Sequence, residues 1–161
     1  MSEFERPVCL PVLALRGLCV FPKMLTHFDV GRKSSMAAVE EALREDQQIF
    51  LVTQKDVETD HPKRNDLYTV GTVSIVKQVL RLPGENMRIL VEGQYRAELL
   101  DIVQSEPYLF GRMQKLEELP YNHSLPRVEA LLRQAHSQFE QFAELSGRNM
   151  QEALLRLLTS E

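Results

Sequence analysis

The sequence predicts an α+β fold in which a β-rich domain over residues 1–118 precedes a helical subdomain over residues 119–161. Three observations lead to this prediction. Two long stretches between residues 70 and 102 alternate apolar and polar side chains around a central turn, which is typical of a β-hairpin. One amphipathic segment near residues 34–46 has helical spacing. The same spacing takes over after residue 124.

The hairpin carries the clearest pattern. Its strands flank Pro83-Gly84-Glu85-Asn86, and a Pro-Gly pair between runs of β-branched residues favours a tight turn. One face of the second strand is apolar except at Gly93, and an interior glycine is typical of a bend or a close backbone approach. The alternation slips by one position near Leu99, and it also slips in the first strand. Such slips indicate bulges, which allow the strands of a small barrel to turn a corner.

Four shorter stretches complete a predicted set of six strands: residues 8–13, 26–30, 49–52 and 108–113. Pro11 cannot donate a ladder hydrogen bond, so the first of these should be an edge strand or be interrupted by a bulge. Residues 49–52, Ile-Phe-Leu-Val, are apolar throughout. This run indicates a strand that is buried on both faces, as under a covering helix.

The helices have recognisable ends. The first should begin at Ser34 or Ser35, since serine is a good N-cap, and should end near Asp46. A longer helix is expected over residues 124–147, and Ser146-Gly147 should form its C-terminal end. Another is expected through residues 149–158. Its apolar face either packs on the β-rich domain or belongs to a larger helical bundle. We favour the bundle, so the helical subdomain would be incomplete.

The composition is that of a globular domain, with 43% hydrophobic and 26% charged residues among 161. No apolar run is long enough to span a membrane, and the N-terminus lacks the apolar core of an export signal, so we expect a cytoplasmic protein. The net charge of -4 argues against nucleic-acid binding, which usually needs a basic stripe. Cys9 and Cys19 are too few for a zinc site and are expected to be small buried hydrophobes.

Known catalytic motifs are absent from the sequence, including the phosphate-binding loop, the nucleophile elbow and H-E-x-x-H. Residues 55–67 hold several carboxylates that suit a hard cation, but their spacing fits no calcium loop and a solvated loop is the simpler interpretation. Lys33 beside Ser34 and Ser35 suggests a nucleophile and base, yet helix capping already explains the serines. We therefore predict no catalytic, cofactor-binding or metal-binding residue, although a fold can assemble such a site from distant positions.

An apolar loop follows the first strand. It covers residues 14–24, leads into Leu25 and contains the breakers Gly17 and Pro22. Its large apolar members are Leu18, Val20, Phe21, Pro22, Met24 and Leu25. If part of the loop is exposed, Met and Phe suit adaptable recognition of apolar peptide segments. Alternatively, Leu18, Val20 and Phe21 plug one end of a barrel, because most apolar runs belong to a core.

Four segments follow one another in a specific order: LPVLALRGLCVFPKM, DVGRKSS, IFLVTQKD and DLYTVGTVSIVKQVLRLPGENMRILVEGQYRAEL. Within the last, LYTVGTV and LVEG, with Arg96-Ala97 after them, are the most distinctive. Together these segments resemble the N-terminal domain of the Lon ATP-dependent proteases, over about residues 8–158. The sequence departs from that family at Ala14 and Gly17, where Pro and Asp are common.

The resemblance implies a small, partly open β-barrel of about six strands with one covering helix, followed by a C-terminal helical subdomain. It implies a non-catalytic domain that binds unfolded or damaged polypeptides through exposed apolar surface. Such a domain would deliver them to the ATPase and Ser-Lys protease domains of a hexameric parent, where ATP and Mg would act. The alternative is an assembly module that supports the hexamer. Neither role involves a cofactor of this chain, nucleic acid or a membrane.

The resemblance defines no sharp binding motif, so the site residues are chosen from the loop and its surroundings. The candidates for apolar substrate contacts are Phe21, Pro22, Met24 and Leu25. The candidates for a polar rim are Arg16, Arg32 and Lys33. Binding should be weak at each contact, because a substrate that is held too tightly is not handed on. For the alternative role, self-association would use Phe139 and Phe142, or Leu154–Leu158.

Overall fold

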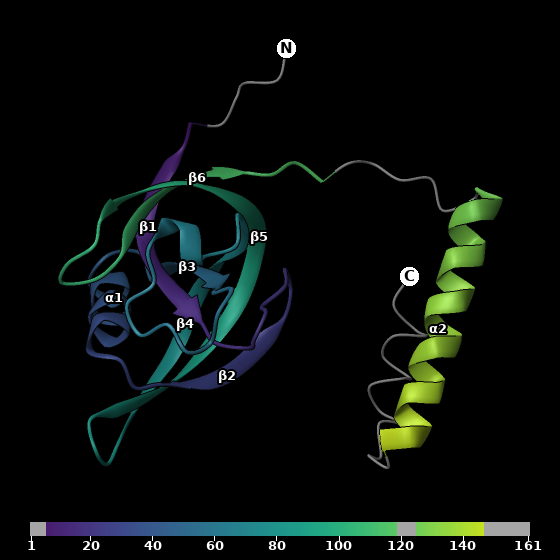
Figure 1. Ribbon diagram of the computed structural model, residues 1–161, viewed down its shortest axis with the longest axis horizontal. Coiled ribbons are helices and arrows are strands. Elements are labelled where there is room, and N and C mark those ends of the chain that lie inside the picture. Colours follow the sequence, from purple (N-terminus) through teal and green to yellow (C-terminus); the bar gives the residue numbers. More distant parts are fainter. Residues whose placement is uncertain (1–5, 119–124, 147–161) are drawn as a thin grey trace. The chain divides into compact units, whose positions relative to one another are not determined.

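A computed structural model describes residues 6–118 and 125–146 of the chain. The chain divides into two compact units, Met1–Glu117 and Glu118–Glu161. The described elements are shown in Figure 1. In chain order they are β1 (Val8–Leu15), β2 (Leu25–Val30), α1 (Lys33–Arg44), β3 (Gln48–Thr53), a 3-10 turn η1 (Arg64–Asp66), β4 (Val70–Leu82), β5 (Asn86–Gln104), β6 (Phe110–Lys115) and α2 (Pro126–Ser146).

All six described strands belong to one sheet, in the order β2-β5-β4-β3-β1-β6. β6 also pairs with β5, so the ladders form a closed circuit from β5 through β4, β3, β1 and β6 back to β5. β1 and β3 are parallel, because the chain crosses from one to the other through β2 and α1, and the remaining pairs are antiparallel. α1 packs against β1, β3 and β4. The predicted six strands and single helix of the first unit are confirmed.

β4 and β5 form the predicted hairpin, with Gly84 at its tip in a left-handed conformation (φ 82°). The ladder between them shifts register between Val76 and Gln78, and the β5–β6 ladder shifts between Leu99 and Asp101. The slips in the sequence pattern are therefore β-bulges, as predicted. β5 is long enough to pair with β2 and β4 and then with β6, and Figure 1 shows it curving around the sheet.

β1 is not an edge strand, so the first of the two expectations for Pro11, an edge position, is wrong. It pairs with β6 through Val8–Pro11 and with β3 through Val12–Leu15. Pro11 is the last residue paired with β6, and the N–H of Val12 donates to the carbonyl of Leu109 at 2.8 Å. The sheet accommodates the missing N–H of Pro11 because β1 changes partner at this residue.

α1 begins earlier than the serines suggest. Its N-cap is Arg32, which makes no side-chain capping bond, and the helix ends at Arg44 rather than near Asp46. Ser34 and Ser35 lie inside the first turn, so the predicted serine cap is wrong. Local preference favours a hydroxyl at the N-cap. Here the guanidinium of Arg32 is instead held by tertiary hydrogen bonds that no local pattern reveals.

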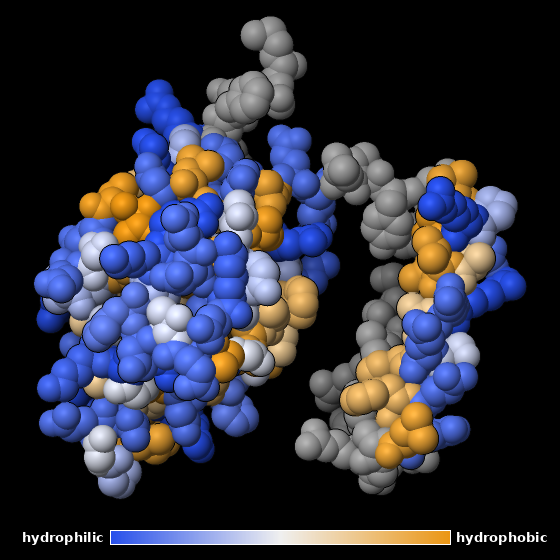
Figure 2. All heavy atoms as spheres, in the orientation of Figure 1, coloured by the Kyte–Doolittle hydropathy of each residue, from blue (hydrophilic) through white to orange (hydrophobic). Residues whose placement is uncertain are grey.

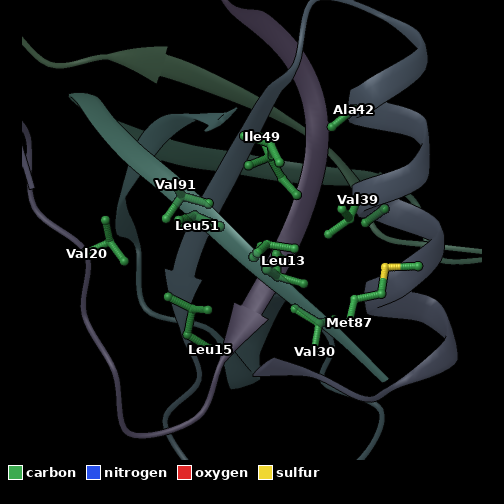
Figure 3. Close-up of a cluster of buried hydrophobic side chains, with 13 residues drawn as sticks. Leu13, Leu15, Val20, Val30, Val39, Ala42, Ile49, Leu51, Met87 and Val91 are labelled. Atoms are coloured by element: carbon green, nitrogen blue, oxygen red, sulfur yellow. The ribbon is translucent and has the colours of Figure 1, made fainter. Parts of the chain in front are cut away.

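A first apolar cluster lies between α1 and the sheet (Figure 3). Val39 and Ala42 reach it from α1, and Ile49 and Leu51 reach it from β3. Val20 enters it from the loop between β1 and β2. The loop therefore contributes to the core as well as to the surface, and both contributions affect the candidate site.

A second apolar cluster contains the other two central side chains of β3, Phe50 and Val52, together with Leu67, Leu99 and Met113. The four side chains from Ile49 to Val52 are between 0% and 2% exposed. β3 is thus buried on both faces, which confirms the interpretation of its continuous apolar run.

The two cysteines are exposed, and the prediction that both are buried is wrong. Cys9 lies in the first half of β1, where the chain is exposed up to the buried Leu10. Cys19 lies in the loop after β1, with its Sγ 3.1 Å from Thr53 Oγ1. At Cys19, a polar partner at the surface therefore replaces the apolar surroundings that were expected.

The second unit is described only in part. α2 is the described portion of the helical subdomain, while the expected cap at Ser124 and the expected helix over residues 149–158 lie outside the described residues. Within the described ranges, neither α-helix has the length and hydropathy needed to cross a membrane.

Candidate functional site

The loop between β1 and β2 crosses three neighbouring strands and is hydrogen-bonded to each of them. On β3, Thr53 Oγ1 donates to the carbonyl of Leu18 at 2.7 Å. On β4, the buried Thr72 Oγ1 donates to the carbonyl of Val20 at 2.6 Å. On β5, the partner is the backbone of Gly93. The loop is therefore tied down along its length rather than only at its ends.

Gly93 is the place where the loop comes closest to the sheet. Its N–H donates to the carbonyl of Met24 at 2.9 Å, and its carbonyl accepts from the N–H of Lys23 at 2.8 Å. A Cβ atom on Gly93 would lie 2.1 Å from the carbonyl oxygen of Phe21, so only glycine fits without movement of the loop. The predicted close backbone approach at this glycine is confirmed.

Residues 21–24 form a tight turn directly above this contact. The N–H of Met24 donates to the carbonyl of Phe21 at 3.1 Å, which closes the turn. Pro22 occupies the second position, where its restricted φ is favourable. Lys23 at the third has a φ of 65°, a region that residues other than glycine seldom adopt. The geometry of the turn is thus set by Pro22 and by the two hydrogen bonds to Gly93.

The turn separates the apolar side chains of the loop into two sets. Val20 is 6% exposed and lies in the first cluster, and Leu18 and Met24 pack against that cluster. Phe21 and Leu25 point outward and are each 61% exposed. The expectation of a core plug is therefore correct for Leu18 and Val20 and wrong for Phe21.

Of the three polar candidates, Arg32 is held most firmly. Its Nη2 donates to the carbonyl of Ala14 and its Nη1 to Gln54 Oε1 at 3.0 Å. Gln54 is only 2% exposed, and its Nε2 donates to the carbonyls of Asp56 and Thr59. Burial lowers the pKa of the Arg32 guanidinium, and the nearby charge of Arg16 adds to this effect. Arg32 thereby joins the end of β1 to the segment after β3.

Arg16 lies next to this network. Its Nη2 is 2.7 Å from Asp60 Oδ1, and this hydrogen-bonded ion pair holds the pKa of Asp60 below its ordinary value. Both groups are largely exposed, so the pair adds little to stability. Lys33, the third polar candidate, is exposed at the first position of α1.

Two hollows border the Arg32 network. The smaller, of about 370 Å³, is lined by apolar side chains of β1 and β2 together with Arg16 and Arg32. The larger, of about 830 Å³, opens beside the first turn of α1 and includes Arg32 and Lys33. None of the four apolar candidates lines either hollow. The structure thus divides the predicted residues into an apolar turn and a polar group around Arg32.

The acidic segment at residues 55–67 is an irregular loop with a short 3-10 turn. Asp56 Oδ1 accepts from the N–H of Glu58, and Asp66 Oδ2 accepts from the N–H of Lys63, so these carboxylates shape the loop. Across residues 6–118 and 125–146, no three His, Cys, Asp or Glu side chains are grouped to hold a metal ion.

Comparison with known proteins shows to which family this chain belongs. The family model of the ATP-dependent protease La (LON) substrate-binding domain matches residues 9–160. The chain belongs to this family. It is 41% identical over 152 residues to Lon protease of Syntrophomonas wolfei subsp. wolfei, covering 94% of the chain and 18% of that protein. It is 39% identical over 147 residues to Lon protease 1 of Bacillus subtilis, covering 91% of the chain and 18% of that protein.

The Lon domain also has solved structural relatives. It is similar to the N-terminal domain of Mycobacterium avium complex Lon protease, with a TM-score of 0.69 and 19% identity over 95% of this chain and 76% of that one. It is similar to a Lon N-terminal domain protein from Xanthomonas campestris, with a TM-score of 0.60 and 13% identity over 81% and 72% of the two chains. At sequence identities of 19% and 13%, the similarity shows a shared fold and nothing more. The chain spans about a fifth of the length of its Lon protease relatives.

Sequence reasoning about the Lon domain missed Gln54 and Thr72. Both are buried polar residues whose side chains have a partner far away in the chain: Gln54 Oε1 accepts from Arg32, and Thr72 Oγ1 donates to the carbonyl of Val20. Neither position stands out from its neighbours in the sequence, because these two distant partners come close to them only in the fold.

Proposed function

We propose that this Lon domain is a non-catalytic substrate-recognition domain. It binds unfolded or damaged polypeptides through exposed apolar side chains and delivers them to the ATPase and protease domains of a hexameric, cytoplasmic parent, where ATP and Mg act. The observation that carries the proposal is the exposure, each 61%, of Phe21 on a turn that is hydrogen-bonded to Gly93 and of Leu25 at the start of β2, directly after that turn. A rigid apolar contact loses little conformational entropy on binding.

The four apolar candidates contribute in different ways. Phe21 and Leu25 offer contact area, and each would bury enough surface for about 1–2 kcal/mol. Pro22 shapes the turn, while Met24 is partly buried and supports it from the core side. We further infer that the closed circuit of ladders acts as a small barrel that keeps the turn in place. Weak and reversible binding suits a domain that passes its ligand on.

The Phe21→Ser/Leu25→Ser double variant tests this proposal. We expect its affinity for an unfolded, apolar-rich polypeptide without net charge to fall at least about thirtyfold, because two apolar contacts of about 1–2 kcal/mol each are lost. Its free energy of unfolding should change by no more than about 0.5 kcal/mol, since both side chains are exposed. Fluorescence anisotropy measures the binding, and urea unfolding measures the stability.

Leu80→Ser is the matched control, because Leu80 is 54% exposed on β4 near the hairpin tip. It should bind the polypeptide as the unmodified chain does. If the double variant keeps full affinity, or if Leu80→Ser weakens binding equally, the turn is not the recognition surface.

A second candidate function is oligomer assembly, and α2 favours it. Its apolar side chains Leu131, Phe142 and Leu145 are 57%, 60% and 88% exposed, whereas Phe139 is partly buried. In Figure 2 apolar side chains follow one side of this helix and charged ones the other. Such a face is typical of helix pairing.

If α2 mediates assembly, the chain should self-associate as its concentration rises, and Phe142→Ser should shift the equilibrium towards monomer by about tenfold. Sedimentation velocity at several concentrations measures this, with Phe21→Ser as a control that leaves association unchanged. A chain that stays monomeric at high concentration contradicts the assembly function for this segment.

A further inference from the structure

The proposed function does not explain which residues line the larger hollow. This hollow is a groove of about 830 Å³ bounded by the start of α1, the loop after β3 and the loop between β5 and β6, with β1 beside them. Part of its lining is apolar and comes from β1, the end of β5 and the two loops: Val12, Ala14, Pro62, Ile102, Pro107 and Leu109. Its volume is in the range of sites that hold a small ligand or a few residues of a peptide.

The charged part of the lining is mainly basic. It contains four cations, Arg32, Lys33, Lys63 and Arg64. None of them makes an ion pair within the ranges that the structure describes, although Arg32 and Arg64 donate to backbone carbonyls. Of the two acidic lining residues, Asp60 is already paired with Arg16, which leaves Glu106. A chain with a net charge of -4 therefore has a groove of the opposite sign.

The N-terminus of α1 opens into the same groove. The N-cap residue Arg32 provides no side-chain acceptor for the first N–H groups, and the first turn contains no acidic residue. The positive end of the helix dipole is thus not compensated from within the helix. Ser35 is only 7% exposed and lines the groove, and its hydroxyl makes no hydrogen bond to any residue of the described ranges.

These features suit an anion attached to an apolar chain. A carboxylate at the start of α1 would accept from backbone N–H groups and from the hydroxyl of Ser35, and Lys33 and Lys63 would neutralise it. Neighbouring apolar side chains of the ligand would contact Ile102 and Leu109. A nucleic-acid backbone fits less well, because Glu106 and the apolar lining offer it no partners.

We propose that this groove binds polypeptide segments in which acidic and apolar residues alternate, with a carboxylate at the N-terminus of α1. The groove is a second recognition surface of the domain, distinct from the one formed by Phe21 and Leu25. The inference rests on the proposed function in one respect, since its ligand is a polypeptide.

The test uses the whole 161-residue chain and a short fluorescent peptide that alternates Glu with Leu. We expect Lys33→Glu/Lys63→Glu to weaken binding of this peptide about tenfold, and rising salt to weaken binding to the unmodified chain. Arg44→Glu/Arg81→Glu makes the same change in charge at exposed positions outside the groove and should leave binding unchanged. The same peptide with Gln in place of Glu should bind at least tenfold more weakly.

Three results would overturn the proposal: equal binding of the Gln peptide, equal weakening by the control pair, or displacement of the peptide by single-stranded DNA or inorganic phosphate at lower concentration. The Phe21→Ser/Leu25→Ser variant separates this inference from the proposed function, because it should still bind the acidic peptide. If the neutral unfolded polypeptide binds and the acidic peptide does not, only the groove proposal fails. If the acidic peptide alone binds, recognition through the turn fails.

Discussion

Replacing Gly93 by alanine is expected to destabilise the domain by about 3 kcal/mol and to displace the turn that carries Phe21. The added methyl group would lie 2.1 Å from the carbonyl oxygen of Phe21 and 3.3 Å from Pro22 Cα, and both are backbone atoms. Backbone cannot rotate aside as the end of a side chain can. The loop must therefore move away from β5 and lose its two hydrogen bonds to Gly93.

The same change should weaken binding of the neutral unfolded polypeptide, because the turn that carries Phe21 and leads into Leu25 is no longer fixed. Urea unfolding followed by circular dichroism gives the stability, and anisotropy gives the affinity. Gly84→Ala is the matched control. Gly84 has a φ of 82° but nothing within 4 Å of an added Cβ, so it should cost about 1 kcal/mol and leave binding unchanged. If Gly93→Ala costs no more than this control, the loop is not anchored at Gly93.

Phe50→Ala is expected to lower the free energy of unfolding by about 4 kcal/mol, the largest single effect that we anticipate. Phe50 is fully buried in the second cluster. Its ring lies against the backbone of β4, since a Cβ atom on Gly71 would be 2.6 Å from Phe50 Cζ. The strand cannot collapse into the space that the ring leaves, so the cavity persists. Urea unfolding measures the loss.

Phe21→Ala is the control for this prediction, since the same side chain is removed from a position that is 61% exposed. Its cost should be within about 0.5 kcal/mol. Comparable losses at the two positions would mean that Phe21 belongs to the core and that the division of the loop into buried and exposed sets is wrong.

Elements with a strong local pattern were predictable from the sequence. The alternation in β5 and the continuous apolar run in β3 identify their buried faces, because side-chain direction in a strand follows directly from its period of two. The bulges were predictable for the same reason, since a bulge shifts the alternation by one residue. Gly93 indicated that another backbone segment lies close to β5, but the sequence did not show that this segment contains Phe21.

Features that depend on distant partners were not predictable. Pro11 is compatible with a central strand only because β1 changes partner there, and this pairing involves β6, about a hundred residues away in the chain. The start of α1 depends on Arg32, whose partners Ala14 and Gln54 come from two other strands or their ends. The groove likewise combines the start of α1, two loops and parts of two strands, which are far apart in the sequence and meet only in the fold.

The closed circuit of ladders has a consequence for how the domain forms. The β4–β5 hairpin joins residues that are close in the chain, so its nucleation loses little loop entropy. The pairing of Val8–Pro11 with β6 joins the first strand to the last, which is the most expensive closure in the sheet. During synthesis the N-terminal half of β1 must therefore wait until β6 has left the ribosome. Until that moment the backbone groups of Val8–Pro11 lack the partners that β6 provides, even where Val12–Leu15 already pair with β3.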